Sequence, residues 1–277
     1  MSADVEDRWV PSMTLERVQK CATVLEAMRA YAMVHVHSVQ GWLQAGPRAA
    51  IWALLDSQVL DGVAGDVMEI GVFHGRTFAL LAASRRPGER AIAVDLFGSE
   101  QRRSTFLANM KRLGIYDSQM DLWDMSSEEF AKNPGRAALA NRIRFLSLDG
   151  GHSYETVIVD LKISETALNA DGVVAFDDFF NPWYPDVTAA LFDYLNGPAA
   201  LTPFALAVNF GPPSQGANKI FLCREPAADR YRAALRGALR SNLRKERRWQ
   251  GFEIDVFDFE KGVYKLDPLR LIDPAKA

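Results

Sequence analysis

Strand-like and helix-like segments alternate along residues 67–223, and this alternation restricts the fold more than any other feature of the sequence. Four short apolar runs and a weaker fifth have the length of buried strands, and most are followed by a segment with helical periodicity. The strand-like runs lie at 67–72, 91–95, 120–123, 143–148 and 173–176, and the helical segments at 77–85, 100–113, 154–169 and 185–196. Such alternation predicts a doubly wound α/β fold, in which helices cover both faces of a mostly parallel sheet.

The two ends of this region have a different pattern. The runs at 204–208 and 219–223 are joined by a Gly/Pro loop without a helix, so we expect this last pair to be antiparallel. Residues 1–61 contain helical patterns at 13–45 and 47–61, and we expect them to form a lid or an oligomer contact. The chain is thus divided into an N-terminal helical segment at 1–61, a core at 62–225 and an extension at 226–277.

Basic residues concentrate in the C-terminal extension. Arginines recur every fourth residue, which on a helix places them in one stripe: Arg232, Arg236, Arg240 and Arg244. A solvated helix face is the commoner explanation of such a stripe. Nucleic acid, an acidic substrate, or acidic surface of the same chain or of another subunit are the alternatives. Residues 252–259 alternate acidic with apolar side chains, as an edge strand does.

Composition excludes several classes of protein. The net charge of −3 over 277 residues argues against binding nucleic acid through bulk charge. Cys21 and Cys223 are too far apart in sequence for a metal motif or a disulfide framework. The acidic start resembles no signal peptide, and no apolar run is long enough to span a membrane. We therefore expect a cytoplasmic globular protein.

A glycine-rich loop follows the first strand-like run. Gly71 and Gly75 are spaced G-x-x-x-G between that run and a helix that begins near Thr77, and Glu69 precedes them. In an open parallel sheet, ligands bind at the carboxyl ends of the strands, and glycine lets the backbone approach a ligand closely. The spacing is not that of the dinucleotide motif G-x-G-x-x-G. A tight strand–helix turn without a ligand would explain the pattern about as well.

Two further acidic residues follow later strands. Asp95 ends the second strand, where a carboxylate can accept hydrogen bonds from both ribose hydroxyls of an adenosine ligand. Asp124 follows the third, and it would meet an adenine amino group while Met125 packs on the ring. Alternatively, Asp124 is simply a helix N-cap.

Three carboxylates are expected to meet at the carboxyl ends of the fourth and fifth strands. Asp149 belongs to the sequence D-G-G-H-S-Y-E, and Asp177 and Asp178 close the fifth strand. Carboxylates this close need a counter-charge, and their oxygens suit a hard cation such as Mg²⁺. Their alternative roles are a helix cap and a solvated strand end. His152, three residues after Asp149, is a candidate base, a helix-start histidine or an additional metal ligand.

The glycine loop and the acidic residues after the second and third strands, in this order, resemble those of the class I S-adenosylmethionine (SAM)-dependent methyltransferases. The resemblance covers residues 60–225. The acidic-x-Gly-x-x-x-Gly pattern of that family matches Glu69, Gly71 and Gly75, and its ribose carboxylate matches Asp95. The resemblance implies a Rossmann-like sheet of seven strands with an antiparallel last strand. It also implies a cofactor site that includes Thr77, Asp124 and Met125.

The D-G-x-H and D-D motifs are similar to those of the metal-assisted O-methyltransferases that act on sugars and other small molecules. This similarity implies that Asp149, Asp177 and Asp178 hold a divalent metal, through which Asp149 acts in catalysis, and that His152 takes the hydroxyl proton. A hydroxylated sugar or natural product is then the expected substrate. We expect no nucleic-acid or membrane partner, and self-association is left open.

Two further features of the sequence point to other functions or to none. The run Asn181-Pro182-Trp183-Tyr184 resembles the box of amino-methyltransferases, but it follows the wrong strand and lacks the second proline. His74, in the glycine loop, would either contact the substrate or the cofactor carboxylate or simply be exposed to solvent. Two rivals remain: an enzyme of another reaction class that resembles cephalosporin hydroxylases, and a non-catalytic SAM-binding protein.

Overall fold

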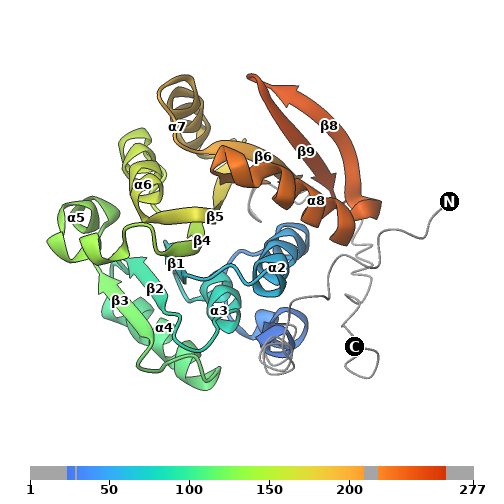
Figure 1. Ribbon diagram of the computed structural model, residues 1–277. Coiled ribbons are helices and arrows are strands. Elements are labelled where there is room, and N and C mark those ends of the chain that lie inside the picture. Colours follow the sequence, from blue (N-terminus) through green and yellow to red (C-terminus); the bar gives the residue numbers. More distant parts are fainter. Residues whose placement is uncertain (1–23, 29, 209–217, 260–277) are drawn as a thin grey trace, which may run out of the picture.

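The computed structural model describes residues 24–259, except residue 29 and residues 209–217 (Figure 1). A sheet of nine strands runs through the molecule in the order β3-β2-β1-β4-β5-β7-β6-β9-β8. The strands are β1 (Asp66–Ile70), β2 (Ala91–Asp95), β3 (Met120–Asp124), β4 (Ile143–Leu148), β5 (Leu168–Phe179), β6 (Thr202–Val208), β7 (Asn218–Cys223), β8 (Leu243–Trp249) and β9 (Phe252–Asp258). Strands β1 to β5 are mutually parallel, and β7 is antiparallel to both β5 and β6.

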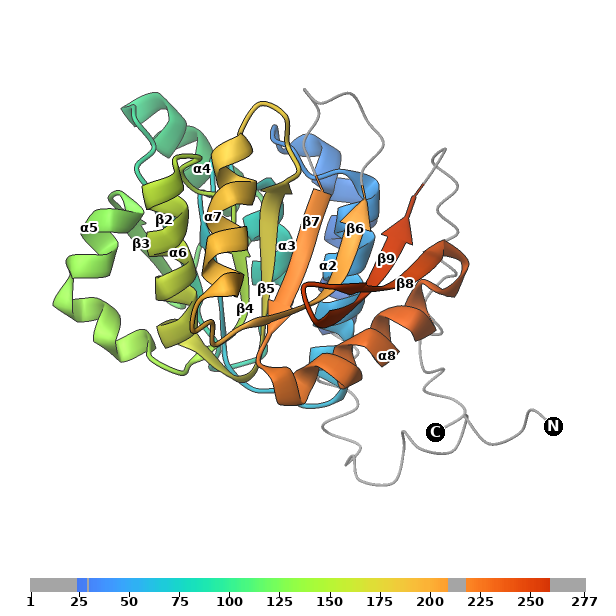
Figure 2. The ribbon, with the colours of Figure 1, turned by 90° about the horizontal axis from the view of Figure 1, so that it is seen from above.

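Helices cover both faces of this sheet (Figure 2). They are α2 (Ala45–Leu60), α3 (Arg76–Ala83), α4 (Glu100–Arg112), α5 (Ser127–Lys132), α6 (Tyr154–Ala167), α7 (Pro185–Asn196) and α8 (Ala228–Ala238). Short helical turns are η1 (Tyr31–His35), η2 (Val36–Ser38), η3 (Pro134–Leu139), η5 (Glu225–Ala227) and η6 (Arg240–Asn242). Alternate strand residues face opposite cores. Val67 and Phe145 pack with α2, α3, α4 and α8, whereas Met68 and Leu146 pack with α5, α6 and α7.

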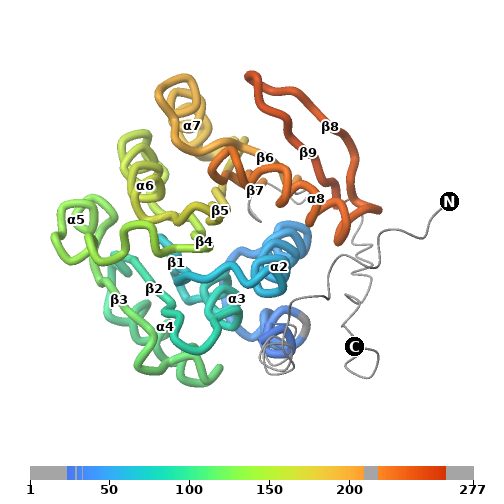
Figure 3. Tube along the Cα trace, in the orientation of Figure 1, coloured from blue at the N-terminus to red at the C-terminus, as the bar shows by residue number. Residues whose placement is uncertain are grey.

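The doubly wound α/β fold predicted from the alternation is confirmed, with two more strands than the seven expected. The added strands are β8 and β9, which form a hairpin in the C-terminal extension. Strand β9 pairs with β6 in parallel, so β8 rather than β9 is the edge (Figure 3). Trp249 of this hairpin packs on Phe179 and Phe192, with ring centroids 5.7 and 5.1 Å away.

The expected arginine stripe is wrong in its second half. Helix α8 ends at Ala238, so Arg240 lies in a short 3-10 turn and Arg244 lies in β8. Arg236 forms ion pairs with Asp255 of β9 and Glu246 of β8. The first half of the stripe therefore binds acidic surface of its own chain, because strand pairing brings that hairpin beside α8.

The N-terminal helix expected at 13–45 is shorter at its C-terminal end. The helical turns stop at Ser38, before Val39, which is extended, and Gly41, which has a positive φ of 151°; residues 13–23 lie outside the described part. Arg76 of α3 holds this segment, since its guanidinium donates to the backbone carbonyls of Val36, Val39 and Gly41. In the described residues, no helix has the length and apolar character needed to cross a membrane.

Candidate active site

A cavity of about 630 Å³ opens at the carboxyl ends of β1, β2, β4 and β5. Residues that follow four strands converge on it, as the doubly wound topology requires. From the predicted site, the cavity is lined by Gly71, Asp95, Met125, Asp149, His152, Asp177 and Asp178. The two expected half-sites, one for an adenosine ligand and one for a metal, therefore share one cavity.

The glycine loop forms one wall of the cavity. Gly71 and Gly75 both have positive φ, of 85° and 90°. A Cβ atom at Gly71 would lie 1.8 Å from the carbonyl oxygen of Asp149, so no side chain fits there. At Gly75 a Cβ would lie 2.5 Å from the side chain of Met110. Gly71 thus lines the cavity and joins the two half-sites, whereas Gly75 lets the loop pack on α4.

Glu69 and Thr77 are placed differently from the sequence expectation. Both are buried, and neither is among the residues that line the cavity. Glu69 accepts a hydrogen bond of 3.1 Å from Ser147 in β4, and its second oxygen has no partner in the described structure. Burial raises the pKa of Glu69 to about 8, against the opposing charge of Lys219. The predicted contacts of Glu69 and Thr77 with a cofactor therefore stay predictions.

Asp95 occupies the position expected of a ribose carboxylate. It accepts backbone hydrogen bonds from Phe73 (2.8 Å) and Phe97 (2.5 Å), one on each oxygen. These two residues have positive φ, of 47° and 51°. A carboxylate has about four lone-pair directions, so two bonds leave acceptor capacity toward the cavity. Asp95 both fixes the two loops and presents a charge to a ligand.

Asp124 does not reach the cavity, although its neighbour Met125 does. Its carboxylate forms an ion pair of 2.9 Å with Arg103 of α4. It is not the helix N-cap either, because Ser126 caps α5 and completes a capping box with Glu129. Ser126 thus takes the capping role considered for Asp124, and the adenine contact of Asp124 stays a prediction.

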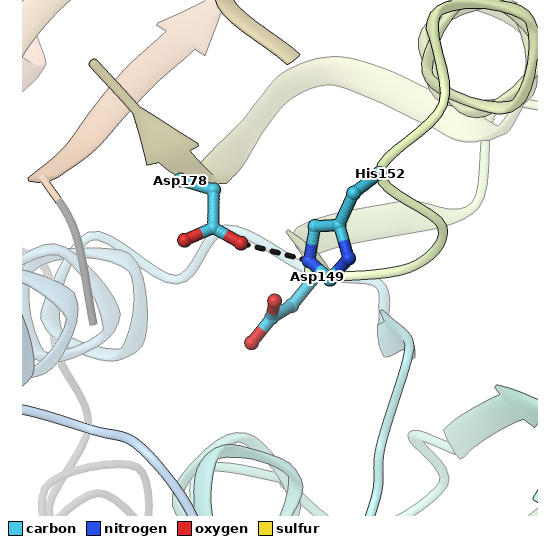
Figure 4. A group of neighbouring side chains, drawn as sticks. All are labelled: Asp149, His152 and Asp178. Atoms are coloured by element: carbon cyan, nitrogen blue, oxygen red, sulfur yellow. Dashed lines mark ion pairs between the residues drawn. The ribbon is translucent and has the colours of Figure 1, made fainter. Parts of the chain in front are cut away.

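The second half-site contains a cluster of Asp149, His152 and Asp178 (Figure 4). One potential ligand atom from each lies within 4.8 Å of the others. His152 Nε2 donates to Asp178 Oδ2 at 2.8 Å, and Asn181 donates to the other oxygen at 2.7 Å. Asp178 has a φ of 58°, a strained value for a residue other than glycine. The strain places its carboxylate between His152 and Asn181.

Asp177 lines the same cavity but lies outside the cluster of candidate metal ligands. One oxygen of Asp177 accepts the backbone N–H of Asp178 at 2.9 Å, and the other pairs with the ammonium of Lys219. His152 takes the third place in the cluster that Asp177 was expected to fill. Lys219 is not among the site residues predicted from the sequence, although a lysine at the start of the apolar run K-I-F-L-C can indicate a buried counter-charge.

The pKa values of the two carboxylates of the cluster are shifted in opposite directions. Burial, together with the negative charge of Asp177, raises the pKa of Asp149 well above its ordinary value. Burial acts on Asp178 in the same direction, but the hydrogen bonds from His152 and Asn181 outweigh it and lower its pKa. Asp178 is therefore the ionised partner of His152. No described residue donates a hydrogen bond to the Asp149 carboxylate.

Aromatic side chains form the rim of the cavity. Trp42 and Trp183, which are far apart in the sequence, both line the cavity and remain 55% and 66% exposed. Tyr184 stacks on His152, with ring centroids 3.9 Å apart. Arg102 also lines the cavity, and its guanidinium lies over Phe73. The sequence contains no motif that marks Trp42, in the loop before α2, or Arg102, in α4, as a residue of the cavity.

His74 lies outside the lining of the cavity. Its ring stacks on Phe73 at 3.8 Å, and burial lowers its pKa. Asn181, from the run resembling an amino-methyltransferase box, is buried and holds Asp178 and the backbone N–H of Trp183. This run therefore supports the carboxylate cluster and the aromatic rim.

Comparison with known families identifies the part of the chain that forms this cavity. Residues 68–179 match the family model of a methyltransferase domain. The match covers less than half of the chain, from β1 to the end of β5. An uncharacterised protein of Acanthamoeba polyphaga mimivirus, R132, is 27% identical over 125 residues, which are 45% of this chain. The aligned part spans 56% of that viral protein.

Three solved structures with a similar fold are described as O-methyltransferases. One from Klebsiella pneumoniae, described as putative, has a TM-score of 0.53 and 12% identity, covering 78% of this chain and 91% of that one. TomG from Streptomyces achromogenes, solved with SAM, has a TM-score of 0.51 and 14% identity over 78% and 92%. An enzyme from Bacillus cereus, in complex with SAH, has a TM-score of 0.51 and 14% identity over 80% and 95%. Residues 68–179 thus match a methyltransferase domain, and the solved structures share the Rossmann-like fold that the sequence predicted.

Proposed function

We propose that the protein is a SAM-dependent O-methyltransferase that acts on a hydroxyl group of a small molecule. The observation that carries this proposal is the shared cavity, which places Gly71 and Asp95 beside Asp149, His152 and Asp178. A methyl donor on one side and a proton acceptor on the other are what methyl transfer to oxygen needs. The methyltransferase domain match and the SAM-bound TomG structure support the same cofactor.

The cofactor site of this proposal is smaller than the one expected from sequence. Asp95 accepts the ribose hydroxyls, the Gly71 backbone lies against the cofactor, and Met125 packs on the adenine. Glu69, Gly75 and Thr77 support the loop from beneath, and Asp124 binds Arg103 instead. SAM held by these residues would supply the methyl group beside Asp149, whose carbonyl adjoins Gly71.

His152 is the proposed general base. Its Nε2 donates to the Asp178 carboxylate, which leaves Nδ1 as the proton acceptor of the neutral ring. As the acceptor oxygen attacks the methyl carbon, the bond between carbon and sulfur breaks and the hydroxyl proton passes to Nδ1. The products are a methyl ether and S-adenosylhomocysteine. Asp178 stabilises the imidazolium that forms, as a buried carboxylate does for other catalytic histidines.

A divalent cation, most simply Mg²⁺, is part of this proposal. The carboxylates of Asp149 and Asp178 are the ligands, since Mg²⁺ in proteins is commonly bound by one or two carboxylates and keeps several waters. When bound, it lowers the pKa of the acceptor hydroxyl and orients its oxygen. The Asp149 carboxylate supports this site, because it is half-buried beside the carboxylates of Asp177 and Asp178 and accepts no hydrogen bond from a described residue, so a counter-charge would stabilise it.

The decisive experiment measures S-adenosylhomocysteine formed from SAM with a panel of hydroxylated sugars and natural products. Asp149→Ala is expected to abolish metal-stimulated turnover, while the matched Asp124→Ala, outside the cavity, leaves turnover unchanged. Full activity after chelation would refute the metal role. SAM consumption without a methylated product would favour another reaction class, and a protein that binds no SAM would refute the proposal as a whole.

A further inference from the structure

Lys219 is a buried cation next to the carboxylates, and the proposed chemistry does not use it. It lies in β7, where residues from Ile220 to Cys223 are also buried, and its side chain is almost inaccessible (2% exposed as a residue). Its ammonium pairs with Asp177 Oδ2. Burial disfavours its charged form, but Asp177 and Asp149 outweigh burial and raise the pKa of Lys219. A buried ammonium is held only by a fixed partner, so this pair is a permanent part of the site.

We propose that Lys219 is a positioning residue that withdraws Asp177 from cation binding and restricts a divalent cation to Asp149 and Asp178. The proposal rests on the metal-assisted methyl transfer described above. It assigns Asp177 to Lys219 and not to the metal. The role of Lys219 is then to determine which carboxylates remain available.

The hydrogen bonds around Asp177 support this assignment. One of its oxygens accepts the backbone N–H of Asp178, and the other is held by the buried ammonium of Lys219. Asp178 also accepts two hydrogen bonds, from His152 and Asn181, but it forms no ion pair with a described lysine or arginine. The carboxylate of Asp149, by contrast, has no donor among the residues that the structure describes. The cluster whose ligand atoms lie within 4.8 Å of one another accordingly contains Asp149 and Asp178 but not Asp177.

The charges give a second argument. Three carboxylates and one ammonium carry a net charge of minus two, which one divalent cation neutralises. Without Lys219, a cation would face three carboxylates, and oxygens from the protein would occupy more of its coordination positions. With Lys219 in place, two carboxylates leave positions open for water and for the acceptor oxygen, as Mg²⁺ sites that bind substrate require.

The test is a double-mutant cycle on cation affinity, which does not depend on turnover. Mn²⁺ replaces Mg²⁺ as the probe, and its binding to the S-adenosylhomocysteine complex is measured by electron paramagnetic resonance. The proteins are the wild type, Lys219→Met, Asp177→Asn, the double variant and Asp149→Asn. The double variant is essential, because it removes both charges and leaves neither partner buried alone. Binding of S-adenosylhomocysteine in the same samples reports on folding and on the cofactor site.

The double variant is expected to lose no more Mn²⁺ affinity than the roughly 10- to 100-fold that changes in outer-shell residues typically cost, while Asp149→Asn, which removes a ligand, is expected to lose more. Lys219→Met should bind about tenfold more tightly, because it frees Asp177. Asp177→Asn should bind more weakly, because the unpaired ammonium repels the cation. A double variant that loses as much affinity as Asp149→Asn makes Asp177 a ligand and overturns the proposal. Wild-type protein that binds no Mn²⁺ also overturns it, whether or not methyl transfer to a hydroxyl is observed.

Discussion

Ionisable side chains lie at both ends of the parallel sheet, but they differ in how completely they are hydrogen-bonded. At the amino end, Arg144 is fully buried and donates to Glu89, Gln58 and Ser84 at 2.7 to 3.3 Å. At the carboxyl end, Asp149 has no donor among the described side chains, and one oxygen of Glu69 is also unpaired. Charges that are completely paired stabilise the sheet. Charges left unpaired are stable only with a ligand or a proton, which is what a binding site needs.

The two ends also respond to pH with opposite sign. At the amino end, burial raises the pKa of Glu89, but the Arg144 charge and the Arg86 hydrogen bonds outweigh it and lower the pKa. Its ion pair therefore contributes stability that is lost as the pH falls. At the carboxyl end the raised pKa of Glu69 means that the folded protein favours the neutral acid. That contribution is lost as the pH rises.

The largest effect is expected from removing a carboxyl-end group that acts in the reaction. His152→Ala should lower turnover by about 10²- to 10⁴-fold, because no proton acceptor remains beside the acceptor oxygen. The free energy of unfolding should change little, since the ring is partly exposed. Steady-state rates with a saturating acceptor, together with chemical denaturation, measure both quantities. His74→Ala is the matched control, and an equal loss of turnover there would contradict the assignment.

The next largest effect is expected at the amino end and concerns stability. Arg144→Met should lower the free energy of unfolding by about 3 to 5 kcal/mol, because it leaves Glu89 and Gln58 buried without their partner. Arg90→Met is the control, since Arg90 is 43% exposed in its pair with Asp121 and such pairs contribute about 0 to 1 kcal/mol. Urea unfolding of both variants decides the matter. Equal losses would show that the amino-end network is no stronger than a surface pair.

A smaller effect separates two acidic residues that sequence reasoning placed together. Asp95→Ala should weaken SAM binding by about 1.5 to 3 kcal/mol, the range for hydrogen bonds to a charged group. Asp124→Ala should leave SAM binding unchanged, because its carboxylate pairs with Arg103 outside the cavity. Isothermal titration calorimetry with SAM compares the two. Weaker binding by the Asp124 variant would place this residue in the cofactor site after all.

The smallest effect tests the unpaired charge itself. Glu69→Gln should increase the free energy of unfolding at pH 8 by roughly 1 to 3 kcal/mol, because the folded protein no longer has to ionise a buried acid. The gain should fall steadily as the pH is lowered and disappear below about pH 3.5, where the wild-type side chain is largely protonated in both states. Thermal or urea unfolding across this range measures it. A gain that does not vary with pH would mean that packing, and not ionisation, is responsible.

The sequence predicted the topology and the shared edge, because both follow from local patterns. Strand–helix alternation placed Asp95, Asp149 and Asp178 after neighbouring strands, and they do line one cavity. It did not predict the partner of Asp177, since Lys219 comes from a strand 42 residues away and meets it only through antiparallel pairing. The arginine stripe failed for the same kind of reason. A period of four residues shows neither where a helix stops nor which acidic strand will lie beside it.

The contact of Trp249 with Phe179 has a consequence for protein engineering. Phe179 follows Asp178 directly, is 2% exposed and has its ring against the C-terminal hairpin. A minimal version of the protein, trimmed to the segment that matches the methyltransferase domain, would leave this ring facing water beside a strained backbone. Chimeras that exchange acceptor specificity between relatives should therefore carry the hairpin along as a unit with the fifth strand.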